Sequence, residues 1–430
     1  MEAPLLHGLA AADYEPLKSF GDANRVFFAE TKKLWKIAAP IVFGILCQYG
    51  INSVTSIFVG HIGDVELSAV SISVSVIGTF AFGFMLGMGS ALETLCGQAY
   101  GAGQVYLLGV YMQRSWIILT DGSQGCLFPN SFHWRSFFPP KSSFKPKARS
   151  MSLPISAIAS NISSWVTAIA QVIYVVGWCK DGWTGLSWSA FNDIWAFVGL
   201  SFSSAVMLCL ELWYMMSVII LTGHLDNAVY AVGSLSICMN INGLEAMLFI
   251  GINAAISVRV SNELGQGHPV ATKYSVYVTV FQSLLLGLLS MVVILITKDS
   301  FAVIYTSSKE MQAAVSKLAY LLGITMVLNS VQPVISGVAI GAGWQTLVAY
   351  INLGSYYAFG LPLGYLLGYT KHLGVQGLWG GMICGLSLQT ILLLIILYKT
   401  NWTHEVNQSI ERMKRWGGQE VKIVNSADYI

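Results

Sequence analysis

Long apolar stretches without charged side chains recur along this chain, separated by short polar segments. A helix needs about 20 apolar residues to cross the hydrocarbon core of a bilayer. Five stretches reach that length without Asp, Glu, Lys or Arg, and two others contain one acid each. A further stretch, 318–370, is long enough for two helices, and the turn signal Gly341-Ala342-Gly343 divides it. The pattern therefore predicts nine membrane-spanning helices, at 37–64 (up to its acid, Asp64), 67–92, 150–179, 194–223, 228–258, 274–297, twice within 318–370, and at 374–398.

A tenth span is marginal. The stretch 105–120 is only moderately apolar and contains Arg114. The next residues, 121–149, contain four prolines and five basic side chains, and no helical pattern continues through them. One interpretation is a long basic loop, and the other is a segment that stands in place of membrane-spanning sequence.

Composition narrows the class of protein. Hydrophobic residues make up 55% of the 430 residues and charged residues 10%, whereas a soluble domain carries about 25% charged residues. A disordered chain would need low hydrophobicity and high charge. The net charge of +2 gives no indication of nucleic-acid binding. We therefore expect an all-α polytopic membrane protein that binds no nucleic acid.

Motifs for enzymatic or metal chemistry are not recognisable. The seven cysteines are odd in number, and most lie inside apolar stretches without the paired spacing of a disulfide framework or a zinc site. No nucleophile–base motif or phosphate-binding loop is present in the sequence. We expect no metal site, no cofactor and no enzymatic activity.

An internal repeat divides the chain into two halves, as in many transporters. Gly60-His61 recurs 163 positions later as Gly223-His224. From position 103 to the end of the next apolar stretch at 179 is 76 residues, and from the matching position 267 to the end of the last stretch at 398 is 131, a difference of 55. That difference corresponds to roughly two helices. Four small residues recur at an offset of 164, namely Gly87, Ala91, Gly101 and Gly103 as Gly251, Ala255, Gly265 and Gly267.

Several short motifs resemble one family in type and order. The chain resembles the plant DETOXIFICATION branch of the multidrug and toxic compound extrusion (MATE) transporters, over about 33–119 and 157–400. The motifs are QYGIN at 48–52, GHIG at 60–63, ALETLCGQA at 91–99, CLELW at 209–213, RVSNELG at 259–265, VAIGAGW at 338–344 and AYINL at 349–353.

The resemblance implies twelve helices in two six-helix lobes related by a pseudo-twofold axis, of which this chain would hold nine or ten. The expected divisions are a cytoplasmic tail at 1–35, an incomplete N-lobe at 36–193, a C-lobe of six helices at 194–399 and a cytoplasmic tail at 400–430. Plant members carry a Phe-Pro-Thr-x-Lys-Phe-Leu-Gln-Ala-Gln motif between helices 4 and 5, and its codons read one base out of frame can give residues 138–149. We hypothesise that 121–152 is an aberrant splice product or gene-model error.

Two acids lie inside predicted spans. Placing an ionisable carboxyl at mid-bilayer depth costs free energy, so an acid found there is first considered a functional residue. Glu211 lies in 194–223, where apolar surroundings favour the neutral form of a carboxyl and suit a proton carrier. The resemblance places it at the helix-7 acid linked to ion coupling, and the alternative is a buried carboxyl satisfied by a neighbouring helix. Glu245 lies on a helix where the family has polar groups that line a cavity. Asn240 and Asn242 are candidates for substrate contact or for hydrogen bonds between helices.

Asn329 stands where many members of the family have an aspartate. An amide cannot take up a proton, so a scheme with two coupling carboxylates is not expected, and Asn329 is a candidate hydrogen-bond partner of Glu211. Pro333, one turn later, removes a helical hydrogen bond and can kink the helix, so it is a candidate either for gating or for a static bend.

In the first half, Gln48 and Tyr49 are polar positions on helix 1 and candidates for lining a cavity. Thr55 stands where bacterial relatives have an acid, so cation binding in that lobe is not expected in the same form. Glu93 lies near the end of the second span, where capping or lobe packing is expected, with a role in transport as the alternative. Aromatic faces attract organic cations, but aromatic residues serve more often as anchors or packing; those considered are Trp213, Tyr214, Trp344, Tyr356, Tyr357 and Trp379.

The buried acid and the resemblance together lead to one expected function. It is a secondary antiporter that exports organic cations, xenobiotics or plant secondary metabolites, driven by a proton or sodium gradient. We expect a monomer in contact with membrane lipid, in the vacuolar or plasma membrane. The alternative is a non-transporting truncated isoform or gene-model fragment that associates with full-length transporters.

Overall fold

A bundle of long helices makes up the described chain. The computed structural model describes residues 13–15, 19–60, 79–118, 152–191, 194–225, 228–306 and 308–415, and within these ranges it contains helices and no β-strand. The basic residues 121–149 lie outside the described residues. The α-helices are α1 (Phe20–Gly60), α3 (Thr79–Gly101), an unlabelled helix at 106–118, α5 (Ser152–Trp178), α6 (Ile194–Thr222), α7 (Ala228–Gln266), α8 (Pro269–Thr297), α9 (Lys309–Ala342), α10 (Gln345–Asn352), α11 (Leu361–Tyr365), α12 (Gly374–Lys399) and α13 (Trp402–Arg415).

The helices follow the apolar stretches of the sequence. By length and composition, α6, α7, α8, α9 and α12 are each able to cross a membrane. Gly343 has a φ of 84° and ends α9, because a left-handed backbone is accessible to glycine, so the turn predicted there is confirmed. Beyond it, one continuous helical rod runs to Thr370 through α10, the π-helix η5 (Leu353–Gly360), α11 and the π-helix η6 (Leu366–Thr370).

Several predicted helix limits are wrong. α1 begins at Phe20 rather than at 37, and α8 begins at Pro269 rather than at 274. α3 continues to Gly101 rather than ending at 92, and α7 continues to Gln266 rather than 258. The added turns carry polar side chains, such as Thr94, Gln98 and Arg259, that are buried against other parts of the protein. Hydropathy treats such residues as exposed to lipid and therefore predicts helices that are too short.

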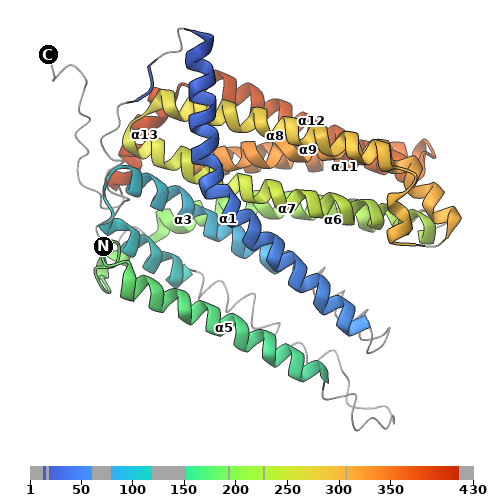
Figure 1. Cartoon of the computed structure of the whole chain (residues 1–430), viewed down its shortest axis with the longest axis horizontal. Helices are drawn as coiled ribbons and strands as arrows, with labels where there is room; N and C mark the ends of the chain where they lie inside the picture. The colour runs from blue at the N-terminus through green and yellow to red at the C-terminus, as the bar shows by residue number, and fades with distance from the viewer. Residues whose placement is uncertain are drawn as a thin grey trace.

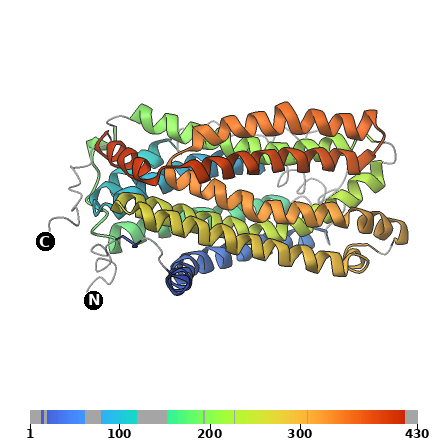
Figure 2. The same ribbon diagram turned by 90° about the horizontal axis from the view of Figure 1, so that it is seen from above.

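The helices of the C-terminal half lie side by side along the long axis of the molecule, and α1 crosses them obliquely (Figures 1 and 2). α1 changes direction part-way along (Figure 1) and contains one internal proline, Pro40. Proline removes a backbone hydrogen bond and bends a helix, which accounts for a change of direction of this kind.

The sequence repeat appears in space as a reciprocal crossing of α3 and α7. A Cβ added to Gly101 would overlap the carbonyl oxygen of Asn262, and a Cβ added to Gly265 would overlap the carbonyl oxygen of Gln98. Each residue of the first contact is 164 positions from its counterpart in the second. Such a mutual contact is the mark of a twofold relation. The two lobes are therefore related by a pseudo-twofold axis that passes between α3 and α7.

A second pair of contacts obeys the same relation. Gly87 of α3 packs directly on the backbone of Ala205 in α6, and Gly251 of α7 packs on Val42 in α1. The glycines are 164 positions apart and their partners 163. The second helix of each lobe thus packs against the first helix of the other lobe.

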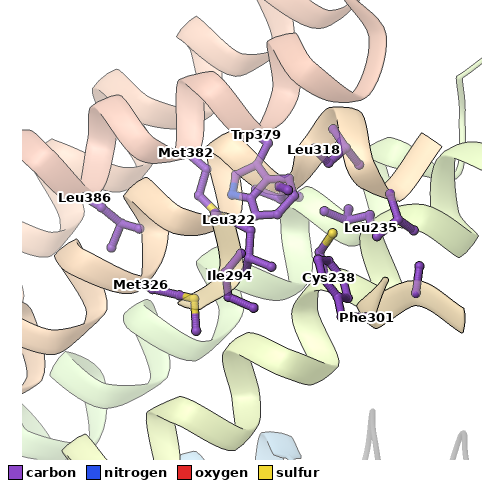
Figure 3. Close-up of a cluster of buried hydrophobic side chains, with 14 of the residues drawn as sticks. Leu235, Cys238, Ile294, Phe301, Leu318, Leu322, Met326, Trp379, Met382 and Leu386 are labelled. Carbon is purple, nitrogen blue, oxygen red and sulfur yellow. The ribbon is translucent and has the colours of Figure 1, made fainter. Parts of the chain in front are cut away.

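The largest buried apolar cluster lies inside the C-lobe. Figure 3 shows Trp379 and Met382 of α12 pointing toward Leu322 of α9. The Trp379 indole donates a hydrogen bond to Thr325 Oγ1 at 2.9 Å. This cluster joins α9 and α12, and it includes Tyr214 and Tyr356, which are described below.

Both ends of the described chain dock at the same end of the bundle. Asp13 accepts hydrogen bonds from the backbone N–H groups of Val270 (2.9 Å) and Ala271 (2.8 Å), at the start of α8. Arg412 of α13 donates to the carbonyl oxygen of Ala342, at the end of α9 (3.2 Å). The two ends of the described chain therefore lie at the same end of the bundle.

A buried ionic network joins the lobes at this same end. Arg259 of α7 bonds Glu30 of α1 at 2.9 Å and Glu263 of its own helix at 2.6 Å. His268 Nδ1 lies 2.9 Å from Glu263 Oε2. Because Glu30 belongs to the first half and Arg259 to the second, the network holds the two halves together on the tail side.

Candidate functional site

Glu211 lies on α6 and faces into the C-lobe. The amide of Gln332, on α9, faces its carboxyl group. Its Oε2 atom is buried and has no hydrogen-bond partner among the described residues. Gln332 in turn donates to Ser336 Oγ at 3.2 Å. The carboxyl is therefore removed from water and surrounded by neutral groups.

Tyrosines from the π-helix η5 line the same side of α6. The rings of Tyr356 and Tyr214 stack at a centroid separation of 4.4 Å and an interplanar angle of 5°. Tyr356 lies close enough to Glu211 for an electrostatic interaction. The Tyr357 hydroxyl donates to the carbonyl oxygen of Leu210 at 3.0 Å. From the sequence these tyrosines were expected to serve as anchors or packing. The one sequence feature that could have linked them to the site is the position of Tyr214, one helical turn after Glu211.

Two of the predicted cavity residues meet each other. Asn329 Nδ2, on α9, donates to Asn242 Oδ1, on α7, at 3.1 Å, and both side chains are buried. Asn240 does not join them: its amide is exposed and donates to the Ser236 carbonyl of its own helix at 2.9 Å. The hydrogen bond between Asn329 and Glu211 expected from the sequence is replaced by contact of Glu211 with Gln332.

Glu245 points to a different part of the lobe. Both of its carboxyl oxygens are buried, and its carboxyl faces the Ser290 hydroxyl on α8. Asn242, one turn earlier on α7, instead contacts α9. Glu211 and Glu245 therefore face different neighbours on different helices of the same lobe.

Pro333 sits where α7 and α9 pack tightly. Its carbonyl oxygen accepts a hydrogen bond from Asn253 Nδ2 at 2.6 Å. A turn later on α9, a Cβ on Gly337 would overlap the Asn253 carbonyl oxygen. Proline also deprives the carbonyl of Asn329, four residues earlier, of its usual helical donor. Asn329, which pairs with Asn242, therefore lies at the position of α9 where the regular helical hydrogen bonding is interrupted by Pro333.

The predicted N-lobe residues are placed less fully. The side chains of Gln48 and Thr55 lie outside the described residues. Tyr49 is half-buried and faces Tyr305, at the end of the short 3₁₀ helix η4 (Phe301–Ile304), rather than Glu211. By the repeat offset of 163, Gln48 is the counterpart of Glu211.

Glu93 lies inside α3, two turns before its end, so it does not cap the helix. Its carboxyl faces the hydroxyl of Ser257 on α7. Ser257 is 164 positions after Glu93 and is its repeat counterpart. This acid therefore lies on the pseudo-twofold axis, between the lobes.

The parts of the chain that the structure describes bring no three His, Cys, Asp or Glu side chains together in a way that could hold a metal ion. What they do contain is a helical bundle with two repeat-related lobes and buried carboxyl groups, among them Glu211 and Glu245 of the C-lobe. These features define a polytopic membrane transporter.

The comparisons with known proteins give the family. The MatE family model matches residues 40–123 and 203–366, which together exceed half of the chain, so the chain belongs to the MATE family. Protein DETOXIFICATION 35 of Arabidopsis thaliana is 62% identical over 476 aligned positions, which cover 97% of this chain and 98% of that protein. Protein DETOXIFICATION 34 of the same plant is 58% identical, with 96% and 86% covered.

Solved structures share the fold. The eukaryotic MATE transporter AtDTX14 matches with a TM-score of 0.77 and 27% identity, covering 90% of this chain and 99% of that one. The Vibrio cholerae MATE transporter VcmN in its bent form has a TM-score of 0.67 at 16% identity, with 90% and 99% covered. The chain is thus an integral multi-pass membrane protein of a multidrug and toxin efflux family, and not an enzyme.

The same comparisons show that the two halves of the chain differ in length. The two family matches begin 163 positions apart, yet the first spans 84 residues and the second 164. The first match ends at residue 123, where the basic stretch begins. The alignment to DETOXIFICATION 35 has 476 positions but covers 97% of 430 residues, or about 417, so about 59 positions of that relative have no counterpart here.

Proposed function

We propose that this protein exchanges protons for organic cations, xenobiotics or plant secondary metabolites, and that Glu211 carries the proton. The observation that supports this most directly is the buried carboxyl itself. In the part of the chain that the structure describes, its Oε2 has no hydrogen-bond donor, and the residue that faces the carboxyl is the neutral Gln332. A protonated carboxyl is stable in such a place, whereas a carboxylate there needs new donors or a cation.

Exchange follows from this difference. When the proton leaves, the carboxylate attracts a cationic substrate, and a bound substrate disfavours return of the proton. Proton and substrate are then linked through the same equilibrium between lobe conformations. Because Asn329 is an amide paired with Asn242, we assign coupling to one carboxyl of this site and give the asparagines a role in hydrogen-bonding the substrate.

The test is transport by the purified full chain in proteoliposomes, with labelled tetraethylammonium as the probe. We expect an imposed pH gradient to drive its accumulation, and Glu211→Gln to reduce that accumulation by about tenfold or more, because the variant has no proton to exchange. Glu411→Gln, at an exposed position of α13, is the matched control. Accumulation driven by a sodium gradient alone, or unchanged in Glu211→Gln, would contradict the proposal.

A second function is favoured by one observation, the roughly 59 aligned positions that are missing here relative to DETOXIFICATION 35. We propose that the N-lobe lacks about two helices and that 121–152 stands in their place. Such a chain would bind full-length relatives in the vacuolar or plasma membrane instead of acting as a monomer. Co-purification with a tagged full-length relative, together with no transport by the chain alone, would support this alternative.

A further inference from the structure

Several buried polar atoms of the C-lobe have no hydrogen-bond partner among the described residues, and two of them have complementary chemistry. The Tyr356 hydroxyl and Glu211 Oε2 are both buried without a hydrogen-bond partner among the described residues. Buried polar groups are nearly always hydrogen-bonded, so each exception calls for a physical reason. A phenol can donate one hydrogen bond, and an ionised carboxylate oxygen can only accept.

The backbone register keeps these two groups near each other. Asn352 Nδ2 donates to the Met207 carbonyl oxygen of α6 at 3.2 Å, and the Tyr357 hydroxyl donates to the Leu210 carbonyl oxygen at 3.0 Å. These bonds fasten the helical rod around η5 to α6 just before Glu211. Tyr356 itself interacts with Glu211 electrostatically.

Tyr214 fixes the ring of Tyr356 but not its hydroxyl. The Tyr214 hydroxyl donates to the Met382 carbonyl oxygen at 3.2 Å. It occupies a slot between Gly360 and Gly385, where a Cβ on either glycine would overlap it. Because Tyr214 is held there and its ring stacks at 4.4 Å on Tyr356, the ring plane of Tyr356 is set, and the hydroxyl stays available.

Other ionisable groups on the elements around α6 are engaged elsewhere. Glu93 of α3 faces Ser257, and Glu245 of α7 faces Ser290. On α12, Cys384 lies near Tyr214. The Tyr357 hydroxyl already donates to the backbone, and from α9 the neutral Gln332 amide faces Glu211.

We propose that Tyr356 is a positioning residue for ion coupling, whose hydroxyl donates a hydrogen bond to the Glu211 carboxylate once the proton has left. The inference rests on the proposed function of Glu211. It also gives the π-helix η5 a role, since π-helical turns occur often at functional sites.

The experiment is an infrared difference titration of the full chain in liposomes, with the carboxyl band of Glu211 assigned by its loss in Glu211→Gln. We expect Tyr356→Phe to raise the pH at half-deprotonation of that band by about one unit or more, a tenfold change in proton affinity. The sign follows because removing a donor from a carboxylate disfavours the charged form. A midpoint that stays at the wild-type value, or a band that does not titrate, would overturn the inference.

Two tyrosine variants are matched controls. Tyr111→Phe also removes a buried hydroxyl without a partner among the described residues, but in the other lobe, so its midpoint is expected to equal the wild-type one. Tyr320→Phe removes a hydroxyl on α9 that accepts a hydrogen bond from Lys298 Nζ at 3.0 Å, twelve residues before Gln332, and its midpoint is also expected to equal the wild-type one. If either control shifts the midpoint as far as Tyr356→Phe, the inference is wrong.

A measurement on the unaltered chain covers the case in which Tyr356→Phe does not fold. The phenol C–O band of a tyrosine-labelled sample is expected to change with the same pH midpoint as the Glu211 band, and no such change would overturn the inference. Failure of the proposed function is read separately. If the proposed function is wrong, pH-driven transport is unchanged in Glu211→Gln. If only this inference is wrong, Glu211→Gln still loses transport, and Tyr356→Phe leaves the midpoint of the Glu211 band unchanged.

Discussion

At the scale of single residues, Arg412 shows how one side chain connects distant parts of the chain. Its Nη1 donates to Gln98 Oε1 at 3.1 Å, on α3, and to the Ala342 carbonyl oxygen at the end of α9. Its guanidinium group lies directly over Gly343, so a Cβ at that position would collide with it. A glycine is required at this turn both for its backbone conformation and for the arginine above it.

Removal of this arginine should weaken the bundle. We expect Arg412→Ala to lower the free energy of unfolding by about 1–3 kcal/mol, because a buried amide and a helix-end carbonyl lose a charged donor. Arg415→Ala, at an exposed position of the same helix, is the control. Burial lowers the pKa of the Arg412 guanidinium, but arginine remains charged, so the effect should be the same from about pH 5 to pH 9. Thermal melting in detergent at several pH values measures it.

Candidate site residues could be predicted from the sequence only where chemistry marks them. Acids and amides inside apolar stretches stand out, and so Glu211, Asn242 and Asn329 became candidates from the sequence alone. Tyr356 was not distinguished from packing residues, because its importance depends on a hydroxyl that the fold leaves without a partner. The hydrophobic pattern of a sequence does not show which buried polar group will find a hydrogen-bond partner.

At the scale of helices, the crossing of α3 and α7 depends on glycine. Gly101 and Gly265 each lie against a backbone carbonyl of the other helix, and there is no space for a side chain. Small residues allow this close approach in membrane bundles, where packing contributes much of the attraction between helices. Hydropathy located both helices, but only the contacts explain why they continue past their apolar stretches.

The reciprocal contacts predict equal effects from two distant substitutions. We expect Gly101→Ala and Gly265→Ala each to destabilise the protein by about 1–3 kcal/mol, as overpacking does. Gly44→Ala, in α1, has nothing within 4 Å of the added Cβ and is expected to be neutral or slightly stabilising. Denaturation of the three variants in one detergent compares them. A large difference between Gly101→Ala and Gly265→Ala would contradict the twofold relation.

At the scale of the whole molecule, the tails decide the topology. Asp13 and Arg412 both dock where α8 begins and α9 ends, at the same end of the bundle, which predicts that the two tails share a side of the membrane. The five basic side chains within 121–149 oppose this arrangement if they lie on the other side, because positive charges favour the cytoplasm.

The shared side can be measured directly. Epitope tags at the two ends of the chain should become accessible together when only the plasma membrane of a cell is permeabilised, with the protein in an internal membrane. A tag inserted in 121–149 should remain protected under the same conditions. Access to one terminal tag without the other would mean an odd number of crossings.

The sequence by itself determined the class of protein, the places of most helices and the existence of two related halves. These properties depend on local composition and on spacing along the chain, and both can be read from the order of residues. The tertiary structure alone decided which helices cross, where polar turns are buried and which of the buried polar groups remain unpaired. Those outcomes depend on contacts between residues far apart in the chain, such as Asn329 with Asn242 and Arg412 with Gln98. Such contacts exist only after the helices have packed.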